Sequence, residues 1–377
     1  MKNIILVLFT LIFVGYSCNS NQTQTPVLSE SIAKIGVFDG YGASQSCVWE
    51  TAEAIKIDDG MEVRIITTSD IANGCLDSLD AIIFPGGSGS RQYLNLGHKN
   101  HDRIRNFVAN GGGALGICAG AYLFTNTPDY ASLSISGAEA IDIEHDNRGH
   151  GLSKITLSDE GKILFPELAD RDTSYVMYFE GPVIINADDT INYTSFGTME
   201  SDVHEEGNAP ANMTNGKPFF IGNRYGKGKV FSSVGHPEYT PGMHWIIPRI
   251  VRWTLDMDYV SYSDNAVRPT IFEKEMLFSK EMLKRESEYF YTLLYGSPEE
   301  KIEALDWLES KMSAAAKRWI QGLLYDSSAI VRARAAKYIA NSEFTYYLPD
   351  LRAALNNEND EDTYAILNSS IQFLEDL

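Results

Sequence analysis

Short apolar runs alternate with helical periodicity through the first third of the chain. Four runs have the length of buried strands: 33–38, 63–67, 81–84 and 113–117. Between and after them, three segments have helical character: 44–57, 101–109 and 121–124. Strands that alternate with helices in this way predict right-handed βαβ units and a parallel sheet flanked by helices.

After Phe124 the pattern changes to strands separated by polar turns. Strands are predicted at 133–144, 154–157, 175–179 and 191–196. A β-hairpin is predicted over 218–234, with its turn in the glycine- and lysine-rich segment 225–229. The amphipathic segment 243–255 is typical of a helix, and we expect it to close an α/β domain that spans 32–260.

From Pro269 to the end, the spacing of apolar residues is helical throughout. The segment 326–336 resembles the second helix of a HEAT repeat, and two further segments supply the next helix pair: 348–355 and 364–374. An earlier, degenerate member is predicted at 297–308, and a generic helical bundle is the alternative. We therefore expect a separable all-α, HEAT-like domain over 264–377, with the chemistry confined to the first domain.

The N-terminus predicts export. Lys2 precedes an apolar run over 4–14, which is too short for a membrane span of about 20 residues. Gly15-Tyr16-Ser17 before Cys18 resembles a bacterial lipobox, which implies a signal peptide over 1–17 and acylation of Cys18. The alternative is an ordinary cleaved signal with an incidental cysteine. Residues 18–31 then form a tether, and the protein is expected at the bacterial cell envelope, facing the periplasm.

The charge balance excludes some partners. The 377 residues carry a formal net charge of −20 and no cluster of lysine and arginine, which argues against nucleic acid. An anionic membrane surface would repel the chain, so membrane contact is expected only through the lipid. With 44% hydrophobic and 22% charged residues, the composition is that of a globular protein.

A nucleophile and a base follow two of the predicted strands. Gly116-Ile117-Cys118-Ala119-Gly120 joins a strand to a short helix, and a sharp turn of this kind needs glycine on both sides. His236 and Glu238 lie two residues apart after the apolar stretch 230–234, so an imidazole and a carboxylate come within reach of each other. We interpret Cys118, His236 and Glu238 as a catalytic triad; a structural histidine is the alternative for His236 alone.

These motifs resemble a known domain. They are, in chain order, Gly40-Tyr41-Gly42-Ala43-Ser44, Phe84-Pro85-Gly86-Gly87, Leu115 to Tyr122 (LGICAGAY), Tyr178-Phe179-Glu180-Gly181-Pro182, Gly226-Lys227-Gly228-Lys229-Val230 and Gly235-His236-Pro237-Glu238. Together they resemble the amidotransferase-like N-terminal domain of fungal biotin–protein ligases, within the class I glutamine amidotransferase-like superfamily. The resemblance covers about Ala33 to Leu255 and implies a flavodoxin-like sheet. No ligase domain follows, so biotinylation is not implied.

The resemblance also implies roles for further residues. Backbone N–H groups of Gly86 or Gly87 and of Ala119 would form the oxyanion hole. Substrate contacts are expected from the motif residues Tyr122, Tyr178 and Glu180.

One departure bears on the substrate. Glutaminases of the wider family continue the elbow with histidine and glutamine, whereas this chain has Ala121-Tyr122. We therefore expect another small-molecule or peptide substrate with an amide or acyl group. No cofactor is needed. The rival hypothesis is a non-catalytic lipoprotein that binds a ligand, or a protein partner through its helical repeats.

The remaining cysteines and histidines leave alternatives open. Cys47 and Cys75 could form a disulfide in an exported protein, or remain two buried free thiols. His145 and His150 could bind a metal with Glu144 or Asp146, but the segment lacks metal-site spacing, and we predict no metal.

Overall fold

The computed structural model describes residues 32–145, 147–187, 191–205, 207 and 209–377. Within it, residues 32–377 form one compact unit. The predicted signal peptide, tether and acylated Cys18 lie outside the described residues, as does Asp146. Among the described helices, none has the length and hydropathy needed to cross a membrane.

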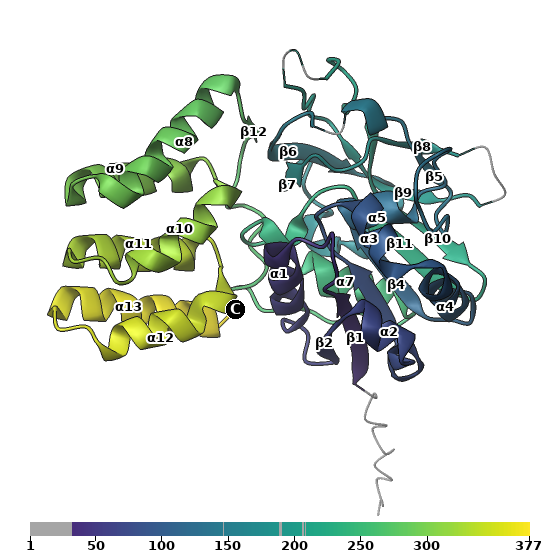
Figure 1. The fold of residues 1–377 in the computed structure, drawn as a ribbon, viewed down its shortest axis with the longest axis horizontal. Coiled ribbons are helices and arrows are strands. Elements are labelled where there is room, and N and C mark those ends of the chain that lie inside the picture. Colours follow the sequence, from purple (N-terminus) through teal and green to yellow (C-terminus); the bar gives the residue numbers. More distant parts are fainter. Residues whose placement is uncertain (1–31, 146, 188–190, 206, 208) are drawn as a thin grey trace, which may run out of the picture. The chain divides into compact units, whose positions relative to one another are not determined.

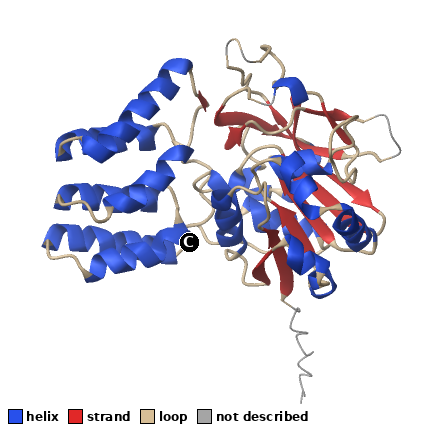
Figure 2. Cartoon of the chain, in the orientation of Figure 1, coloured by secondary structure: helices blue, strands red, loops and turns tan. Residues whose placement is uncertain are grey.

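One large sheet runs through the α/β part (Figures 1 and 2). Its strands are β1 (Ala33–Phe38), β2 (Met61–Ile66), β3 (Ala81–Phe84), β4 (Gly113–Ile117), β6 (His150–Leu157), β7 (Ser174–Phe179), β9 (Thr194–Met199), β10 (Lys217–Tyr225), β11 (Gly228–Ser233) and β12 (Met276–Leu277). The order is β2-β1-β3-β4-β11-β10-β9-β6-β12, and β7 also pairs with β6. Strands β5 (Ala138–Ala140) and β8 (Ile184–Asn186) form a separate small sheet.

The sheet has two halves of different polarity. Strands β2, β1, β3, β4 and β11 are parallel, as the βαβ pattern predicts. From β11 through β10, β9 and β6 the pairing is antiparallel, and a tight hairpin turn joins β10 to β11. The predicted parallel sheet is therefore confirmed for one half only, and the whole sheet is mixed.

Helices cover both faces of the parallel half (Figure 1). They are α1 (Gln45–Ile55), α2 (Thr68–Ala72), α3 (Gly89–Leu96), α4 (His98–Ala109), α5 (Ala119–Phe124) and α7 (Ile246–Thr254). Helix α6 (Asp159–Leu164) packs instead against β9 and β6 of the other half. In β3, Ile83 packs with the cluster under α1 and α7, whereas Ile82 and Phe84 pack with the cluster under α4 and α5. Burial on both faces explains why these strands are continuous apolar runs.

Several local predictions hold, and some fail. The bounds of β1, β3 and β4 agree with the predicted runs, and the hairpin of β10 and β11 turns where expected. The sequence pattern indicates no helix over 89–96, where the structure has the polar helix α3. The strand predicted over 133–144 shrinks to β5, and Ser134 in that segment has a left-handed φ of 52°.

The helices between Lys280 and Glu375 form three stacked pairs (Figures 1 and 2). The helices are α8 (Lys280–Tyr295), α9 (Pro298–Ser310), α10 (Lys317–Leu323), α11 (Ala329–Asn341), α12 (Leu348–Asn356) and α13 (Glu361–Glu375). Their apolar faces make a core of their own, separate from the clusters under the sheet. Stacked pairs bury these faces only against neighbouring pairs.

The expected boundary near residue 264 is crossed by specific contacts. β12 follows Pro269 and adds a strand to the sheet beside β6, so the C-terminal part is not helical throughout. Glu343 is 1% exposed and accepts a hydrogen bond from the N–H of Gly242 at 2.8 Å. It also pairs with Arg268.

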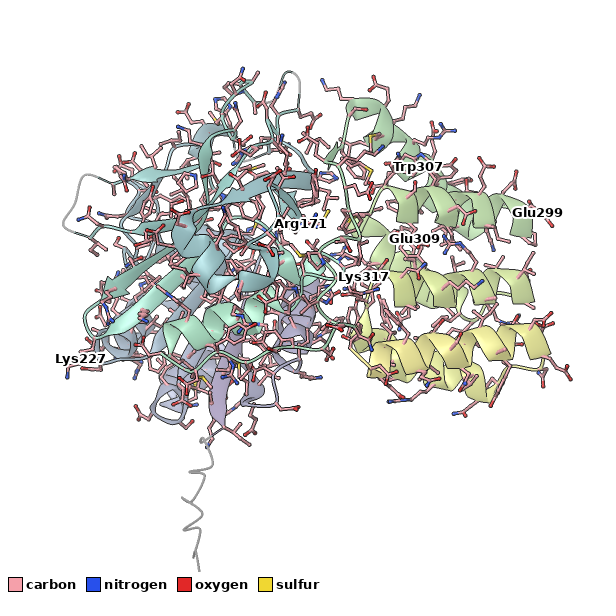
Figure 3. All side chains as sticks on the ribbon, turned by 180° about the vertical axis from the view of Figure 1, so that it is seen from behind. Arg171, Lys227, Glu299, Trp307, Glu309 and Lys317 are labelled. Carbon is pink, nitrogen blue, oxygen red and sulfur yellow. The ribbon has the colours of Figure 1, made fainter. Side chains whose placement is uncertain are left out.

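Lys317 of α10 makes the most buried of these contacts. It is 1% exposed and forms an ion pair with Glu50 of α1, which is also 1% exposed. Figure 3 shows Lys317 between the helical pairs and the α/β part. The ammonium group lies 4.0 and 4.3 Å from the ring centroids of Phe344 and Tyr346. Burial lowers the pKa of Lys317 well below its usual value, although the nearby Cys47 counteracts this.

We predict that replacing one partner of this ion pair destabilises the protein more than replacing both partners. Lys317→Met or Glu50→Leu alone leaves one buried charge without its partner, which costs about 3–5 kcal/mol in comparable cases. The double substitution should lose less than either single one, and chemical denaturation would measure the three free energies of unfolding. As a control, Arg352→Ala breaks an exposed pair with Glu375 and should cost about 0–1 kcal/mol. Additive losses in the double variant would contradict a coupled buried pair.

Candidate active site

Cys118 lies at a strained turn between β4 and α5. Its φ of 51° and ψ of −104° are unusual for a residue with a side chain. A Cβ on Gly120 would come within 1.9 Å of the carbonyl oxygen of Phe84, and one on Gly116 within 2.5 Å of the carbonyl oxygen of Gly120. Both glycines of the motif are therefore required by packing, and the turn leaves the sulfur at the carboxyl end of the sheet.

The pairing of β4 with β11 brings His236 to the same edge. Ile117 and Ser233 are partners in parallel register, and the N–H of Cys118 donates to the carbonyl oxygen of Ser233 at 2.8 Å. Three residues after Ser233, the N–H of His236 donates to the carbonyl oxygen of Met177 in β7 at 2.7 Å. The nucleophile and the histidine thus leave neighbouring strands at nearly the same level.

Glu238 orients the imidazole. Its Oε1 lies 2.7 Å from Nδ1 of His236, and the two residues are 0% and 5% exposed. Burial alone would lower the pKa of His236, but the carboxylate of Glu238 and the adjacent Cys118 outweigh it and raise that pKa well above its usual value. The pair can therefore hold a proton taken from Cys118.

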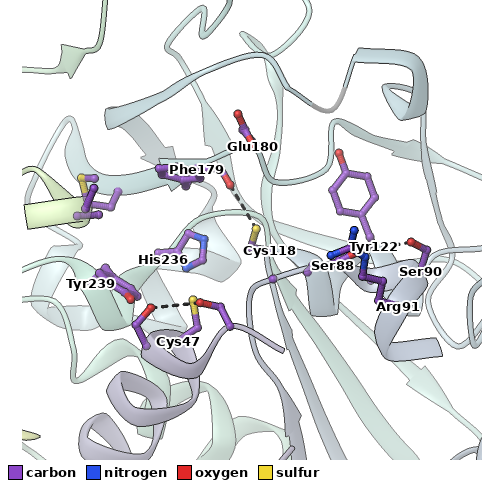
Figure 4. Close-up of a pocket in the computed structure, with 18 of the residues that line it drawn as sticks. Cys47, Ser88, Ser90, Arg91, Cys118, Tyr122, Phe179, Glu180, His236 and Tyr239 are labelled. Atoms are coloured by element: carbon purple, nitrogen blue, oxygen red, sulfur yellow. Dashed lines mark hydrogen bonds between the residues drawn. The ribbon is translucent and has the colours of Figure 1, made fainter. Parts of the chain in front are cut away.

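The thiol group of Cys118 is held beside the imidazole (Figure 4). It donates a hydrogen bond to the carbonyl oxygen of Phe179 at 3.3 Å, and Cys118 is 7% exposed. The next residue, Glu180, has a left-handed φ of 54°. A Cβ on Gly181 would come within 1.8 Å of the carbonyl oxygen of Val234, so this turn packs tightly against the strand that leads to His236.

Two of the predicted oxyanion-hole residues belong to the same pocket as Cys118. Gly87 and Ala119 both line the pocket next to Cys118. The bridge between Ala43 and Gly87 uses the N–H groups of Ser44 and Ser88, not that of Gly87. Ala119 is the first residue of α5, where the N–H has no acceptor within the helix. Gly86 has different neighbours from Gly87. Its carbonyl oxygen accepts a hydrogen bond from the N–H of Ser44, and its Cα faces His236 and Cys47.

These groups open into a pocket of about 1070 Å³. Residues of the α/β part line one side: Ser44, Ser46, Cys47, Gly87, Ser88, Gly89, Ser90, Arg91, Cys118, Ala119, Tyr122, Tyr130, Ile143, Met177, Phe179, Glu180, His236 and Tyr239. The helical part supplies the rest: Phe290, Ala314, Ala315, Arg318 and Trp319. The second part therefore forms a wall of the pocket, whereas the predicted triad and oxyanion-hole residues all belong to the first part.

The three predicted substrate-binding residues have different positions. Tyr122 and Glu180 line the pocket (Figure 4). Tyr178 does not line it: its side chain is 1% exposed, and its hydroxyl group donates to the carbonyl oxygen of Gly181 at 2.7 Å. Tyr178 therefore supports the turn after β7 instead of facing a ligand.

A buried network holds Tyr122. Its hydroxyl group donates to Asp142, which pairs with Arg148. Arg148 also donates to the Tyr122 oxygen and to the carbonyl oxygen of Gly181, both at 3.0 Å. Tyr122, which departs from the glutaminase pattern, is thus held by hydrogen bonds to the turn that follows β7.

Cys47 and Cys75 are both free thiols in the structure, so the disulfide alternative does not hold. Cys47 lies in the pocket, whereas Cys75 begins a 3₁₀ helix (Cys75–Ser78) and packs beside the cluster under α4 and α5.

His150 is accounted for by aromatic packing. Its ring centroid lies 4.4 Å from that of Phe179 and 4.5 Å from that of Phe278. Burial lowers the pKa of His150 to about 4, so the ring is neutral. His145 and Glu144 lie in a 3₁₀ helix (Ile143–His145).

Sequence reasoning missed Cys47, Tyr239 and the wall formed by Phe290, Arg318 and Trp319. Tyr239 could have been found from its place directly after the His-x-Glu motif. The others come from segments distant in sequence from the elbow, and no local pattern marks them.

Part of the chain is similar to a known protein family. Residues 33–137 match the family model of the biotin–protein ligase N-terminal domain. No curated protein matches the chain.

Solved structures with similar architecture are distant. A cytoplasmic protein of Salmonella typhimurium LT2 matches 59% of this chain and 99% of its own, at 13% identity and a TM-score of 0.40. Another cytoplasmic protein of Salmonella typhimurium matches 59% of this chain and 98% of its own, at 11% identity and a TM-score of 0.41. The β-galactosidase of Rahnella sp. R3 matches 60% of this chain, at 15% identity and a TM-score of 0.38, and the match spans 32% of that enzyme.

We predict that iodoacetamide alkylates Cys118 faster than Cys47 or Cys75, because His236 can remove its proton. His236→Ala should slow the reaction of Cys118 roughly tenfold or more, since general-base help from a histidine contributes roughly 10²–10⁴-fold in enzyme reactions. Peptide mass spectrometry over time would give each rate, with Cys75 as the internal control. Equal Cys118 rates in the native and His236→Ala proteins would remove the case for a coupled pair.

Proposed function

We propose that this protein is a cysteine-dependent hydrolase or acyltransferase that acts on an amide or acyl substrate, with Cys118, His236 and Glu238 as a triad. The observation that supports it is the convergence of a strained, pocket-facing thiol group with an imidazole that a buried carboxylate orients. The proposal includes membership of the class I glutamine amidotransferase-like superfamily, but not glutaminase activity.

The chemistry would proceed in two steps. His236 takes the proton of the Cys118 thiol group as the sulfur bonds to the carbonyl carbon. The negative charge on the carbonyl oxygen is then stabilised by the N–H groups of Gly87 and Ala119. His236 returns the proton to the leaving amine or alcohol, which leaves a thioester on Cys118. Water, deprotonated by His236, attacks the thioester and releases the acid; an amine in place of water would give transfer.

The pocket supports a substrate larger than glutamine. Its helical wall carries the aromatic pair of Phe290 and Trp319, whose ring centroids are 5.5 Å apart and nearly parallel. The exposed Arg91 and Arg318 put two cations at the pocket of a chain with a net charge of −20. Such a lining suits a substrate that has an apolar portion and an anionic group near its amide or ester bond.

The helical part would then serve substrate recognition. We interpret its three helix pairs as HEAT-like repeats, two of which supply the pocket wall, through Phe290 on α8 and through Arg318 and Trp319 on α10. The rival function is a non-catalytic binding protein that uses this same pocket. The strained conformation of Cys118 favours catalysis, because backbone strain of this kind costs about 1–3 kcal/mol and needs a compensating purpose.

The proposed location is the bacterial cell envelope, through a lipid on Cys18. The support is the sequence alone: an apolar run too short to span a bilayer, followed by Gly15-Tyr16-Ser17-Cys18. A tether of about a dozen residues would separate the anchor from the described unit.

We predict that a p-nitrophenyl ester of an anionic acid, such as the hemisuccinate, acylates Cys118 faster than the neutral butyrate ester. Intact-protein mass spectrometry would detect the thioester, and released nitrophenol would give the rate. Cys118→Ser should abolish the adduct. Arg318→Ala should reduce the preference for the anionic ester about 5- to 30-fold, the effect of losing about 1–2 kcal/mol of charged interaction.

A matched control tests whether that loss is specific. Arg352→Ala removes an exposed arginine of the helical part that does not line the pocket, and should leave both rates unchanged. Adducts on Cys47 or Cys75 in place of Cys118 would contradict the triad. An unchanged preference in Arg318→Ala would contradict the substrate class.

We predict that the protein, expressed with its own signal in a bacterium, partitions into the detergent phase. Cys18→Ser should either block processing or release the protein into the aqueous phase, because it removes the acylated thiol. Phase separation followed by mass spectrometry of the N-terminus would measure both. A wild-type protein that is cleaved yet fully aqueous would overturn the anchor.

A further inference from the structure

A second set of groups shares the histidine of the proposed triad. The sulfur of Cys47, a ring nitrogen of His236 and a carboxylate oxygen of Glu238 all lie within 4.8 Å of one another. The three residues are 7%, 5% and 0% exposed, so water does not compete freely for them. They come from α1 and from the segment after β11, two places that meet only in the folded chain.

Two further observations point to a ligand between these groups. Oε2 of Glu238 has no hydrogen-bond partner among the described residues, although it is buried. A buried carboxylate oxygen without a partner is costly and is often explained by a missing ion. In addition, the Cβ that Gly86 lacks would lie 2.7 Å from Cε1 of His236 and 2.9 Å from the sulfur of Cys47. The imidazole and the thiol group therefore converge over the same glycine.

The donor set is that of a borderline-soft divalent metal. Zinc binds sulfur at about 2.3 Å, imidazole nitrogen at about 2.0–2.1 Å and carboxylate oxygen at about 2.0–2.2 Å, in tetrahedral geometry. Such bond lengths place the donors about 3.3–3.6 Å apart. Groups that now lie up to 4.8 Å apart therefore need to approach by roughly 1 Å, whereas the 2.7 Å contact between Nδ1 and Oε1 of Glu238 needs to widen. A fourth position would face the pocket, which Cys47 and His236 both line. Hard cations such as Mg²⁺ prefer oxygen ligands and do not suit this set.

We propose that Cys47, His236 and Glu238 form a binding site for one Zn²⁺-like ion, and that the ion switches off the chemistry of Cys118. The binding site stands by itself, whereas the inhibition rests on the proposed hydrolase function. Glu238 is bonded to Nδ1 of His236, so an ion shared by both residues takes Nδ1. Binding releases the proton of the Cys47 thiol group, and the proton between Nδ1 and Glu238 moves to Nε2, so the ring stays neutral.

The inhibition follows from the single lone pair of neutral imidazole. When Nδ1 binds the ion, Nε2 keeps its hydrogen and can only donate. It can no longer accept the proton of the Cys118 thiol group. Metal binding and general-base catalysis are therefore mutually exclusive at His236, and Cys118 need not be a ligand for the ion to inhibit.

Binding is tested first, without any catalytic readout. Metal-free full-length protein is titrated with Zn²⁺ against a chromophoric chelator, and with Co²⁺ while thiolate-to-metal absorption is recorded. We expect one ion per chain with a thiolate band. Cys47→Ser should weaken binding at least tenfold and abolish the band, whereas Cys118→Ser and the control Cys75→Ser should keep both.

The outcomes separate this site from the alternatives. Absence of stoichiometric binding overturns the proposal. If Cys118→Ser abolishes binding and Cys47→Ser leaves it intact, the ion sits on the nucleophile, and the assignment to Cys47 is wrong. Thermal unfolding of each metal-free variant checks that a loss of binding does not reflect a loss of fold.

Inhibition is tested next, through the rate at which iodoacetamide alkylates Cys118. Zn²⁺ should slow this rate at least tenfold in the native protein, and a chelator should restore it. In Cys47→Ser, the same Zn²⁺ concentration should have no effect. Native binding without a change in the Cys118 rate would overturn the inhibitory role. A protein that binds the ion through Cys47 but hydrolyses no ester would refute only the hydrolase function.

Discussion

The parallel pairing of β4 with β11 is the contact on which the candidate site depends. It places Ile117 opposite Ser233, and the N–H of Cys118 continues the ladder by donating to Ser233. The elbow can then turn only because Gly116 and Gly120 lack side chains. A shift of register by one residue would turn every side chain of the strand to the other face and separate the thiol group from the imidazole.

The antiparallel half of the sheet supplies the backbone groups that hold His236 and the thiol group of Cys118 in place. β7 anchors His236 through Met177, and the turn after β7 supplies the carbonyl oxygen of Phe179 that accepts from Cys118. Buried contacts of Arg148 tie the same turn to Tyr122 on α5. The two halves of the mixed sheet therefore have different tasks, one presenting the nucleophile and the other fixing the histidine and the pocket floor.

The helical part is bound to this site by buried charge, not by a flexible link. Lys317 reaches Glu50 on α1, the helix that also carries Cys47, and the neighbouring Arg318 and Trp319 face the pocket. One turn of α10 thus combines a structural ion pair with a wall of the pocket. Cys47 and His236 converge over Gly86, so the position of α1 bears directly on the proposed metal site.

The sequence by itself determined the elements whose signals are local. The apolar runs of β1, β3 and β4, the glycines around Cys118, and the spacing of His236 and Glu238 all act within a few residues. Only the tertiary structure decided the places of β6, β7 and β9 in the sheet, the supporting position of Tyr178, the free state of Cys47 and Cys75, and the wall formed by Arg318 and Trp319. These depend on contacts between segments far apart in the chain. The periodicity of a strand or helix records which face is buried, but not which distant segment covers it.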